Sequence, residues 1–219
     1  MKALKILIAD DHMIVRNGLK ALLKDQFNFC PTILEATNGA QVVSLVAKNK
    51  FDLVILDATM PKVDGFGALE LIQKNGKVIP TITLIDTYDY FLVKKILGTK
   101  SLGILSKNVE ADELMMAIRN VLDNKKFYCN EVSQLLINES QRKSQNFELF
   151  ESLTKREKEI LEMVAKEYTN DEIGSRLSIS KRTVEGHRKN LKSKLRVKST
   201  IGLFKIAFEC GQFGRMPIN

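Results

Sequence analysis

Cysteine is scarce in this 219-residue chain, and its three residues, Cys30, Cys129 and Cys210, stand far apart. No two of them form a CxxC pair, so the sequence argues against a disulfide framework and against a structural zinc site. The chain also lacks any apolar run approaching the ~18 residues of a membrane-spanning helix. It contains no internal repeat and no low-complexity tract.

The N-terminal segment MKALKILIADDH lacks the features of a secretory signal. Its short apolar run is followed directly by acidic residues, and there is no small-residue cleavage site. The segment therefore predicts a β-strand, and we expect a cytoplasmic protein.

Positive charge exceeds negative charge, with 34 Lys and Arg against 26 Asp and Glu, and the excess is concentrated near the C-terminus. Residues 176–198 hold nine basic residues against Glu185 alone, a net charge of +8. A basic run is often only a solvated surface. A block this dense is also the electrostatic pattern expected of a protein that binds a nucleic-acid phosphate backbone.

The first 125 or so residues alternate between strand and helix patterns. Apolar runs at 5–9, 32–36, 53–56, 78–85 and 103–105 are separated by segments with helical periodicity. Five such units in series predict an α/β domain with a doubly wound, five-stranded parallel sheet. We expect the flavodoxin-like strand order 2-1-3-4-5, with helices on both faces.

The pattern after residue 150 is helical throughout. Thr154 with Glu157, and Thr169 with Glu172, form two capping boxes, and a Ser cap at 180 precedes a helix over 181–195. With a last helix near 199–210, this region predicts an all-α, four-helix domain. We expect domains at 1–125 and 151–219, joined by a linker at 126–150 that holds one short helix and a polar tether. The tether lacks Gly and Pro, so partial helicity is also compatible with it.

Acidic residues follow two strands that neighbour each other in the expected sheet. Asp10 and Asp11 follow the first strand, and Asp57 follows the third. Three carboxylates crowded at one edge repel each other, and a hard cation such as Mg²⁺ relieves that repulsion. Lys107, after the fifth strand, can bring a positive charge to the same edge. A carboxylate, a cation and a lysine are the parts needed to accept a phosphoryl group. For a single Asp, a simple helix-capping role would be the better interpretation.

The segments IADD, LVILDATMPKVDG and GILSK, in this order and spacing, resemble the receiver domain of bacterial two-component response regulators. The resemblance covers about residues 3–123. It implies that Asp57 accepts a phosphoryl group from a sensor histidine kinase and that Lys107 contacts the phosphate. It also implies that Asp10, Asp11, Asp57 and the backbone carbonyl of Thr59 bind Mg²⁺.

Two positions depart from the receiver pattern. Ile85 stands where the family normally has Ser or Thr at the end of the fourth strand, and Ile104 stands where it often has Tyr or Phe. Neither side chain can donate a hydrogen bond to a phosphoryl oxygen. Thr83 or Thr87 would substitute if the register of the fourth strand slipped. We hypothesise that phosphorylation remains possible while its coupling to output is weakened or rerouted, tolerated drift being the alternative.

The helix expected at 181–195 has one apolar stripe, formed by Val184, Leu191 and Leu195. Its opposite face is basic or small and includes Arg182, Gly186, Lys189 and Ser193. Such a helix fits the major groove of B-DNA, and with the preceding helix it forms a helix-turn-helix. Gly186 disfavours the helix by ~1 kcal/mol relative to Ala, so another function must account for it.

Residues 153–213 resemble the LuxR-type helix-turn-helix of NarL/FixJ response regulators, with 181–195 as the recognition helix. The resemblance implies contacts to the bases of double-stranded DNA from Glu185, Gly186 and Lys189. Contacts to phosphates are then expected from Arg182, Thr183, Arg188 and Lys192. Glu185 replaces a Lys often found in the family and, because a carboxylate accepts from cytosine N4, it should narrow the sequence preference. His187 has no partner ligand at helical spacing and is interpreted as a packing or phosphate-facing residue.

The last helix carries the apolar residues Ile201, Phe204 and Phe208. By the same resemblance they pair two DNA-binding domains in a homodimer on DNA, unless they only close the small domain. The sequence as a whole predicts a phosphorylation-regulated transcription factor rather than an enzyme. Three alternatives stay open: a phosphotransfer enzyme, a phosphorylation-independent DNA-binding regulator, and a small-molecule sensor. The enzyme would need a substrate pocket and a second acid or base, and neither is evident. The sensor would need an apolar pocket domain, and the presence of Asp57 and Lys107 argues against it.

Overall fold

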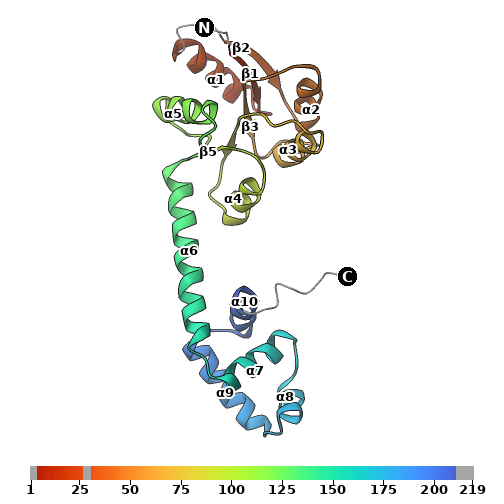
Figure 1. The fold of residues 1–219 in the computed structure, drawn as a ribbon, viewed down its shortest axis with the longest axis vertical. Coiled ribbons are helices and arrows are strands. Elements are labelled where there is room, and N and C mark those ends of the chain that lie inside the picture. Colours follow the sequence, from red (N-terminus) through yellow and green to blue (C-terminus); the bar gives the residue numbers. More distant parts are fainter. Residues whose placement is uncertain (1–3, 27–30, 211–219) are drawn as a thin grey trace. The chain divides into compact units, whose positions relative to one another are not determined.

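The computed structural model describes residues 4–26 and 31–210 (Figure 1). Cys30 and residues 211–219, the end of the expected C-terminal domain, lie outside the described residues. The chain forms two compact units, residues 1–136 and residues 137–219. None of the described helices combines the length and the apolarity needed to traverse a bilayer.

The first unit is a parallel sheet with the strand order β2-β1-β3-β4-β5-β6, which confirms the doubly wound order 2-1-3-4-5. The strands are β1 (Lys5–Ala9), β2 (Thr32–Ala36), β3 (Leu53–Asp57), β4 (Thr81–Ile85), β5 (Gly103–Ser106) and β6 (Phe127–Tyr128). The helices of this unit are α1 (Met13–Gln26), α2 (Gly39–Lys48), α3 (Gly65–Lys74), α4 (Tyr90–Leu97) and α5 (Ala111–Leu122).

Alternation along the strands explains the two helical layers of the first unit. In β1, Ile6 and Ile8 enter one hydrophobic cluster, whereas Leu7 and Ala9 enter another. Helices α1 and α5 supply Leu19, Leu23 and Leu114 to the first cluster, and α2 and α3 supply Val42, Val46 and Leu69 to the second. Figure 1 shows these helix pairs on opposite sides of the sheet. Every residue of β3 is buried, as expected for a central strand covered on both faces.

The interval 126–150 differs from the expected linker with one short helix. It opens with a sixth strand, β6, which pairs in parallel with β5 through Gly103 and Phe127. Two residues are too few to produce a strand periodicity in the sequence, so the expectation of five strands was one short. The interval then continues as a single helix, α6 (Asn130–Glu151).

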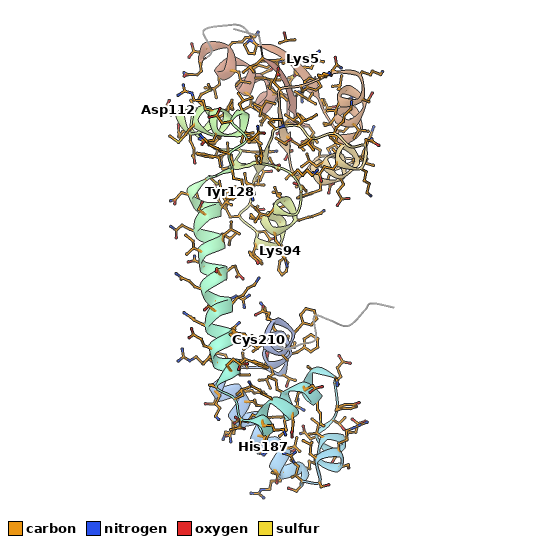
Figure 2. All side chains as sticks on the ribbon, viewed as in Figure 1. Lys5, Lys94, Asp112, Tyr128, His187 and Cys210 are labelled. Carbon is orange, nitrogen blue, oxygen red and sulfur yellow. The ribbon has the colours of Figure 1, made fainter. Side chains whose placement is uncertain are left out.

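Helix α6 is polar over most of its surface, and side chains project from opposite sides of its ribbon (Figure 2). Val132 is its one buried residue. Residues 138–146, in the middle of α6, include no apolar residue and give no periodic signal, but the absence of Gly and Pro lets the helix continue through them. Within the second unit, Arg142 of α6 pairs with Glu139 one turn earlier and with Glu209.

The second unit is helical, as predicted. Its elements after α6 are α7 (Lys155–Ala165), α8 (Asn170–Leu177), α9 (Lys181–Lys194) and α10 (Thr200–Cys210). Both capping boxes are present: Thr154 and Thr169 accept hydrogen bonds from the amides of Glu157 and Glu172, which bond back. Ser180 caps α9 by accepting from the amide of Thr183. The core contains Ile160, Ile173, Val184, Leu191 and Leu203.

The turn between α8 and α9 requires a residue without a side chain at position 174. A Cβ atom added to Gly174 would lie 2.7 Å from the carbonyl oxygen of Ile179. Ser178 ends α8 in the left-handed conformation, with φ of 53°. This close backbone approach accompanies a turn of three residues between the end of α8 and the start of α9.

Candidate functional site

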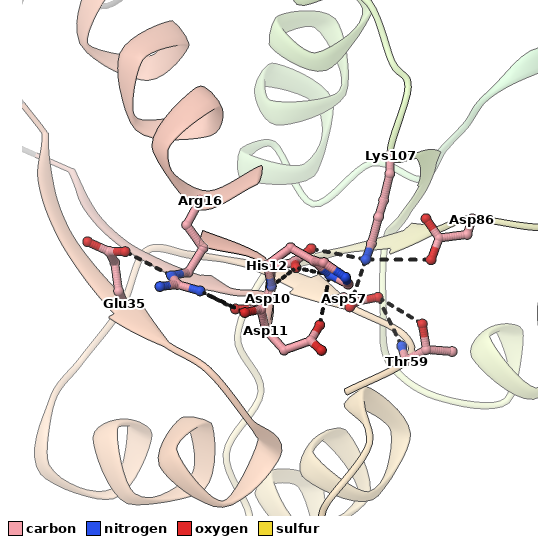
Figure 3. Close-up of polar contacts among 9 residues, drawn as sticks. All are labelled: Asp10, Asp11, His12, Arg16, Glu35, Asp57, Thr59, Asp86 and Lys107. Atoms are coloured by element: carbon pink, nitrogen blue, oxygen red, sulfur yellow. Dashed lines mark hydrogen bonds and ion pairs between the residues drawn. The ribbon is translucent and has the colours of Figure 1, made fainter. Parts of the chain in front are cut away.

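The carboxyl ends of three parallel strands bring one lysine and two aspartates together (Figure 3). Asp10 follows β1, Asp57 is the last residue of β3, and Lys107 follows β5. Lys107 Nζ lies 2.8 Å from Asp57 Oδ2 and 3.2 Å from Asp10 Oδ2. Because β1 and β3 are neighbours, with Ala9 opposite Leu56, the two carboxylates meet at the same edge.

Burial disfavours the charged forms of the three side chains in this cluster. The side chains of Asp10 and Asp57 are fully buried, and that of Lys107 is 8% exposed. Burial raises the pKa of Asp57 above its usual value, although Lys107 and the amide of Thr59 act in the opposite direction. Burial alone would lower the pKa of Lys107, but its contacts with Asp57 and Asp10 outweigh burial and raise it. The one ammonium group of Lys107 therefore pairs with two buried carboxylates, those of Asp10 and Asp57.

The loop after β3 fixes the Asp57 carboxylate. Thr59 donates to Asp57 Oδ1 from its amide, at 2.9 Å, and from its hydroxyl, at 3.3 Å. A Cβ atom on Gly65 would lie only 2.2 Å from the backbone oxygen of Asp57. Gly65 therefore lets the start of α3 pack directly against the strand end that carries Asp57.

A group of possible metal ligands occupies the same edge. Atoms of Asp10, Asp11, His12 and Asp57 lie within 4.8 Å of one another. Asp10 Oδ1 accepts from the amide of His12 at 2.7 Å, whereas the buried Asp10 Oδ2 accepts no hydrogen bond among the described residues and has only its 3.2 Å ion-pair contact with Lys107. Crowded carboxylate oxygens, two of which share a single ammonium, fit a hard divalent cation such as Mg²⁺.

Three further residues belong to this site and were missed in the sequence. His12 Nδ1 lies 3.0 Å from Asp11 Oδ1, Asp86 Oδ2 lies 3.5 Å from Lys107 Nζ, and Arg16 donates to the backbone oxygens of Asp10 and Asp11. Asp86 had a usable signal, because it follows β4 directly, as Asp10 follows β1. Arg16 had none, since its role depends on the turn between β1 and α1.

The residues at the two departures from the receiver pattern are interior. Ile85 is 1% exposed and Ile104 is fully buried. Strand β4 keeps its register, with Asp57 opposite Leu84, so the slip that would have brought in Thr83 does not occur. The Thr83 hydroxyl lies 2.8 Å from that of Ser101, inside the first unit, and the idea that Thr83 substitutes at the site is wrong. Thr87 is exposed beyond the strand.

Helix α9 presents the face expected of a groove-binding helix. Val184, Leu191 and Leu195 are buried. The exposed residues include Arg182, Thr183, Glu185, Gly186 and Lys189. A Cβ atom on Gly186 would meet nothing within 4 Å. Packing inside the second unit therefore does not explain this glycine.

Some cations of α9 have partners within the second unit. Arg188 is half-buried and donates to Asn170 Oδ1 at 2.7 Å and to Thr200 Oγ1 at 3.4 Å. Lys194 lies 2.9 Å from the buried carboxylate of Glu157. Lys192 and His187 are also half-buried. Arg182 and Lys189 are better exposed for an external phosphate or base than Arg188.

Helix α10 divides its apolar residues between two faces. Leu203, Ile206 and Ala207 are buried in the unit core. Ile201, Phe204 and Phe208 are 79%, 42% and 60% exposed, and the two Phe rings stack with centroids 6.3 Å apart. These three residues therefore lie mainly outside the core that Leu203, Ile206 and Ala207 enter.

Comparisons with protein families match both parts of the chain. The response regulator receiver domain matches residues 6–119, and the luxR family of bacterial regulatory proteins matches residues 151–207. The chain is a response regulator with a LuxR-type DNA-binding domain. Members of this family act with histidine kinases and bind DNA as transcription regulators.

Curated relatives and solved structures agree with this assignment. The response regulator is 31% identical to the oxygen regulatory protein NreC of Staphylococcus epidermidis over 217 residues, which cover 94% of this chain and 97% of the relative. NreC of Staphylococcus aureus is 31% identical over 216 residues, with the same coverage. Among solved structures, RcsB of Salmonella typhimurium has a TM-score of 0.66 at 23% identity, over 94% of this chain and 98% of RcsB. The response regulator ChrA of a heme-sensing two-component system has a TM-score of 0.53 at 25% identity, over 94% and 97%.

Proposed function

We propose that Asp57 accepts a phosphoryl group from a phosphohistidine of a sensor histidine kinase and that this controls promoter binding by α9. In this proposal, the domain formed by residues 1–125 receives the signal in the cytoplasm. Residues 126–150 connect it to the domain at 151–219, which binds DNA. The observation that supports it best is the position of Lys107, whose Nζ lies 2.8 Å from Asp57 Oδ2 at the carboxyl edge of the sheet.

The transfer itself follows from the positions of these groups. A carboxylate oxygen of Asp57 attacks phosphorus, the P–N bond breaks, and the imidazole of the donor leaves with a proton. Lys107 is positioned to neutralise charge on the phosphoryl oxygens, and Thr59 holds Asp57 in place through Oδ1. Phosphoryl transfer depends mainly on positioning and charge neutralisation, which these residues supply.

Asp10, Asp11 and Asp57, with the backbone carbonyl of Thr59, would hold Mg²⁺ at this site. The crowding of the three carboxylates, with only Lys107 to neutralise Asp10 and Asp57, supports this choice. When bound, the ion supplies positive charge beside the phosphoryl oxygens.

For the DNA-binding unit, we propose that Glu185, Gly186 and Lys189 approach base edges in the major groove. Arg182, Thr183, Arg188 and Lys192 contact phosphates. The exposure of the first three and the open space beside Gly186 support this orientation. Two copies pair on DNA through Ile201, Phe204 and Phe208, whose exposure leaves that face available.

A phosphorylation-independent regulator is the second candidate. It is favoured by Ile85 and Ile104, which offer no hydrogen bond to a phosphoryl group and no ring that can respond to one. In that case DNA binding would be the same with and without a modified Asp57.

One experiment separates these two functions. The oligomeric state and promoter affinity of the full chain are measured with Mg²⁺, with and without beryllofluoride as a phosphoryl mimic, beside Asp57→Asn. If phosphorylation controls binding, beryllofluoride raises affinity in the wild type and has no effect in Asp57→Asn. Equal affinity in all samples would favour the second candidate, and no DNA binding at all would contradict both.

A further inference from the structure

Lys107 contacts a third carboxylate, on the solvent side of the site. Asp86 Oδ2 lies 3.5 Å from Lys107 Nζ, and the Asp86 side chain is 55% exposed, unlike the buried Asp10 and Asp57 (Figure 3). Asp86 comes directly after β4, next to Ile85. It is absent from the group of close metal ligands among the described residues. Its contact is therefore with the lysine rather than with a shared ion.

An added phosphoryl group would increase the negative charge that Lys107 has to neutralise. Modified Asp57 would carry about two negative charges in place of one, and the ammonium would have to turn toward the phosphoryl oxygens. Asp86 attracts the same ammonium from the open side and repels the incoming anion. Its charge therefore opposes occupancy of the site by a phosphoryl group.

At the two positions where the receiver pattern has a hydroxyl or an aromatic ring, the neighbours of Lys107 are apolar. Ile85 and Ile104 have no hydroxyl or ring to offer, and the Thr83 hydroxyl is engaged with Ser101 in the interior. At this edge the side-chain donors to Asp57 are the Thr59 hydroxyl, on Oδ1, and Lys107, on Oδ2, so Lys107 is the one cation among them. Competition for that one ammonium has a direct effect on how tightly the group is held.

We propose that Asp86 is a positioning residue that weakens the hold of this site on a phosphoryl group by competing for Lys107. The inference rests on the proposed function of Asp57. It assigns to Asp86 the control of how much of the protein stays modified at a given supply of phosphoryl donor.

The test measures the affinity of the full-length protein for beryllofluoride by ¹⁹F NMR, at constant Mg²⁺ and at low and high salt. Asp86→Asn keeps the size of the side chain and removes its charge, and Asp86→Ala removes the contact as well. Because a half-exposed ion pair is worth little, we expect both variants to bind beryllofluoride about 1.5- to 5-fold more tightly at low salt. The gain should shrink at high salt, since exposed charges are screened.

A matched control separates this effect from a general loss of negative charge. Asp123 is 66% exposed and lies 3.5 Å from Lys125 Nζ, a pair with the same separation as that of Asp86 and Lys107. Asp123→Asn should bind beryllofluoride like the wild type. A gain of the same size in Asp123→Asn would overturn the assignment to Asp86.

The remaining outcomes distinguish the inference from the proposed function. If the wild type binds beryllofluoride, Asp57→Asn does not, and Asp86→Asn binds equally or more weakly, only the role of Asp86 is wrong. Weaker binding of Mg²⁺ by Asp86→Asn, followed through backbone amide shifts, would make Asp86 a metal ligand and also overturn the inference. If the wild type and Asp57→Asn both fail to bind beryllofluoride, Asp57 is not a phosphoryl site. That result would contradict both the proposed function and the role of Asp86.

Discussion

Lys107 and Asp57, fifty residues apart in the chain, form a hydrogen-bonded ion pair of 2.8 Å at the edge of a parallel sheet. Asp10 shares the same ammonium at 3.2 Å, so the buried site holds more negative than positive charge. Stability is therefore expected to depend on pH through this cluster.

The first prediction concerns pH. Burial raises the pKa of Asp57 in the folded protein above its ordinary value of 3.8, so the folded state binds more protons than the unfolded state. This contribution to stability is complete below pH 3.8 and is lost as the pH rises through the raised pKa. In a metal chelator, Asp57→Asn should therefore become more stable relative to the wild type as the pH increases.

Urea unfolding from pH 4 to pH 7 measures this difference. A free energy of unfolding that changes in parallel for the wild type and Asp57→Asn would contradict the prediction. Added Mg²⁺ should reduce the advantage of Asp57→Asn, since the ion neutralises the carboxylates that the substitution relieves.

The second prediction concerns the groove-facing side of α9. Lys189 is exposed, and Lys189→Ala should weaken specific promoter binding by about 1–3 kcal/mol. Lys50, exposed in the first unit, provides the control, because Lys50→Ala removes the same charge outside the DNA-binding unit. Titration of a labelled promoter fragment measures both; equal losses would show that only total charge matters.

The third prediction concerns sequence preference. Glu185 is exposed on α9, and its carboxylate can accept from cytosine N4 while repelling phosphate. Glu185→Gln should broaden the selected sequences at one position of each half-site and raise non-specific affinity. Binding-site selection from a random library measures the change, and an identical selected motif would remove Glu185 from the bases.

The fourth prediction concerns dimerisation. Ile201→Asp and Phe208→Ala alter an exposed face of α10, so the free energy of unfolding should change by only about 0.5 kcal/mol. Dimer formation on a two-half-site promoter should fall by about tenfold or more, because central apolar interface residues are worth about 2 kcal/mol or more. Sizing of the protein–DNA complex measures this, and an unchanged complex would place the dimer contact elsewhere.

The fifth prediction concerns the contact between α6 and α10. Arg142 Nη2 lies 3.0 Å from Glu209 Oε1, and Asn146 donates to the same carboxylate. Burial alone would raise the pKa of Glu209, but these contacts outweigh it and lower the pKa. Breaking it with Arg142→Ala should cost about 0.5–1 kcal/mol of stability, as expected of a partly exposed pair. A double-mutant cycle with Glu209→Gln isolates the interaction, and a coupling energy of zero would show that the pair does not contribute.

The sequence predicted most of the architecture because apolar spacing and capping residues are local signals. The runs of β1 and β3, the capping boxes at Thr154 and Thr169, and the apolar stripe of α9 all appear as expected. Strand β6 was missed because it has two residues, and the length of α6 was missed because most of its residues face solvent.

The candidate site was predictable only where residues follow strands. Asp10, Asp57 and Lys107 were found in this way, since parallel strands end at one edge. His12 and Arg16 escaped because their contacts depend on how the first turn of α1 closes over the Asp10–Asp11 backbone. The internal partners of Arg188 and Lys194 escaped because they lie 18 and 37 residues away in the sequence.

Glu157 links α7 and α9, and no local pattern in the sequence indicates this contact. Its carboxylate closes the capping box at the start of α7 and also pairs with Lys194, the last residue of α9. A chimera that grafts another regulator's recognition helix into this scaffold would therefore have to keep a cation at position 194. A graft that exchanges only the solvent-exposed residues of α9 and keeps Lys194 preserves its ion pair with Glu157. The DNA sequence preference can then be redesigned without disturbing the contact between α7 and α9.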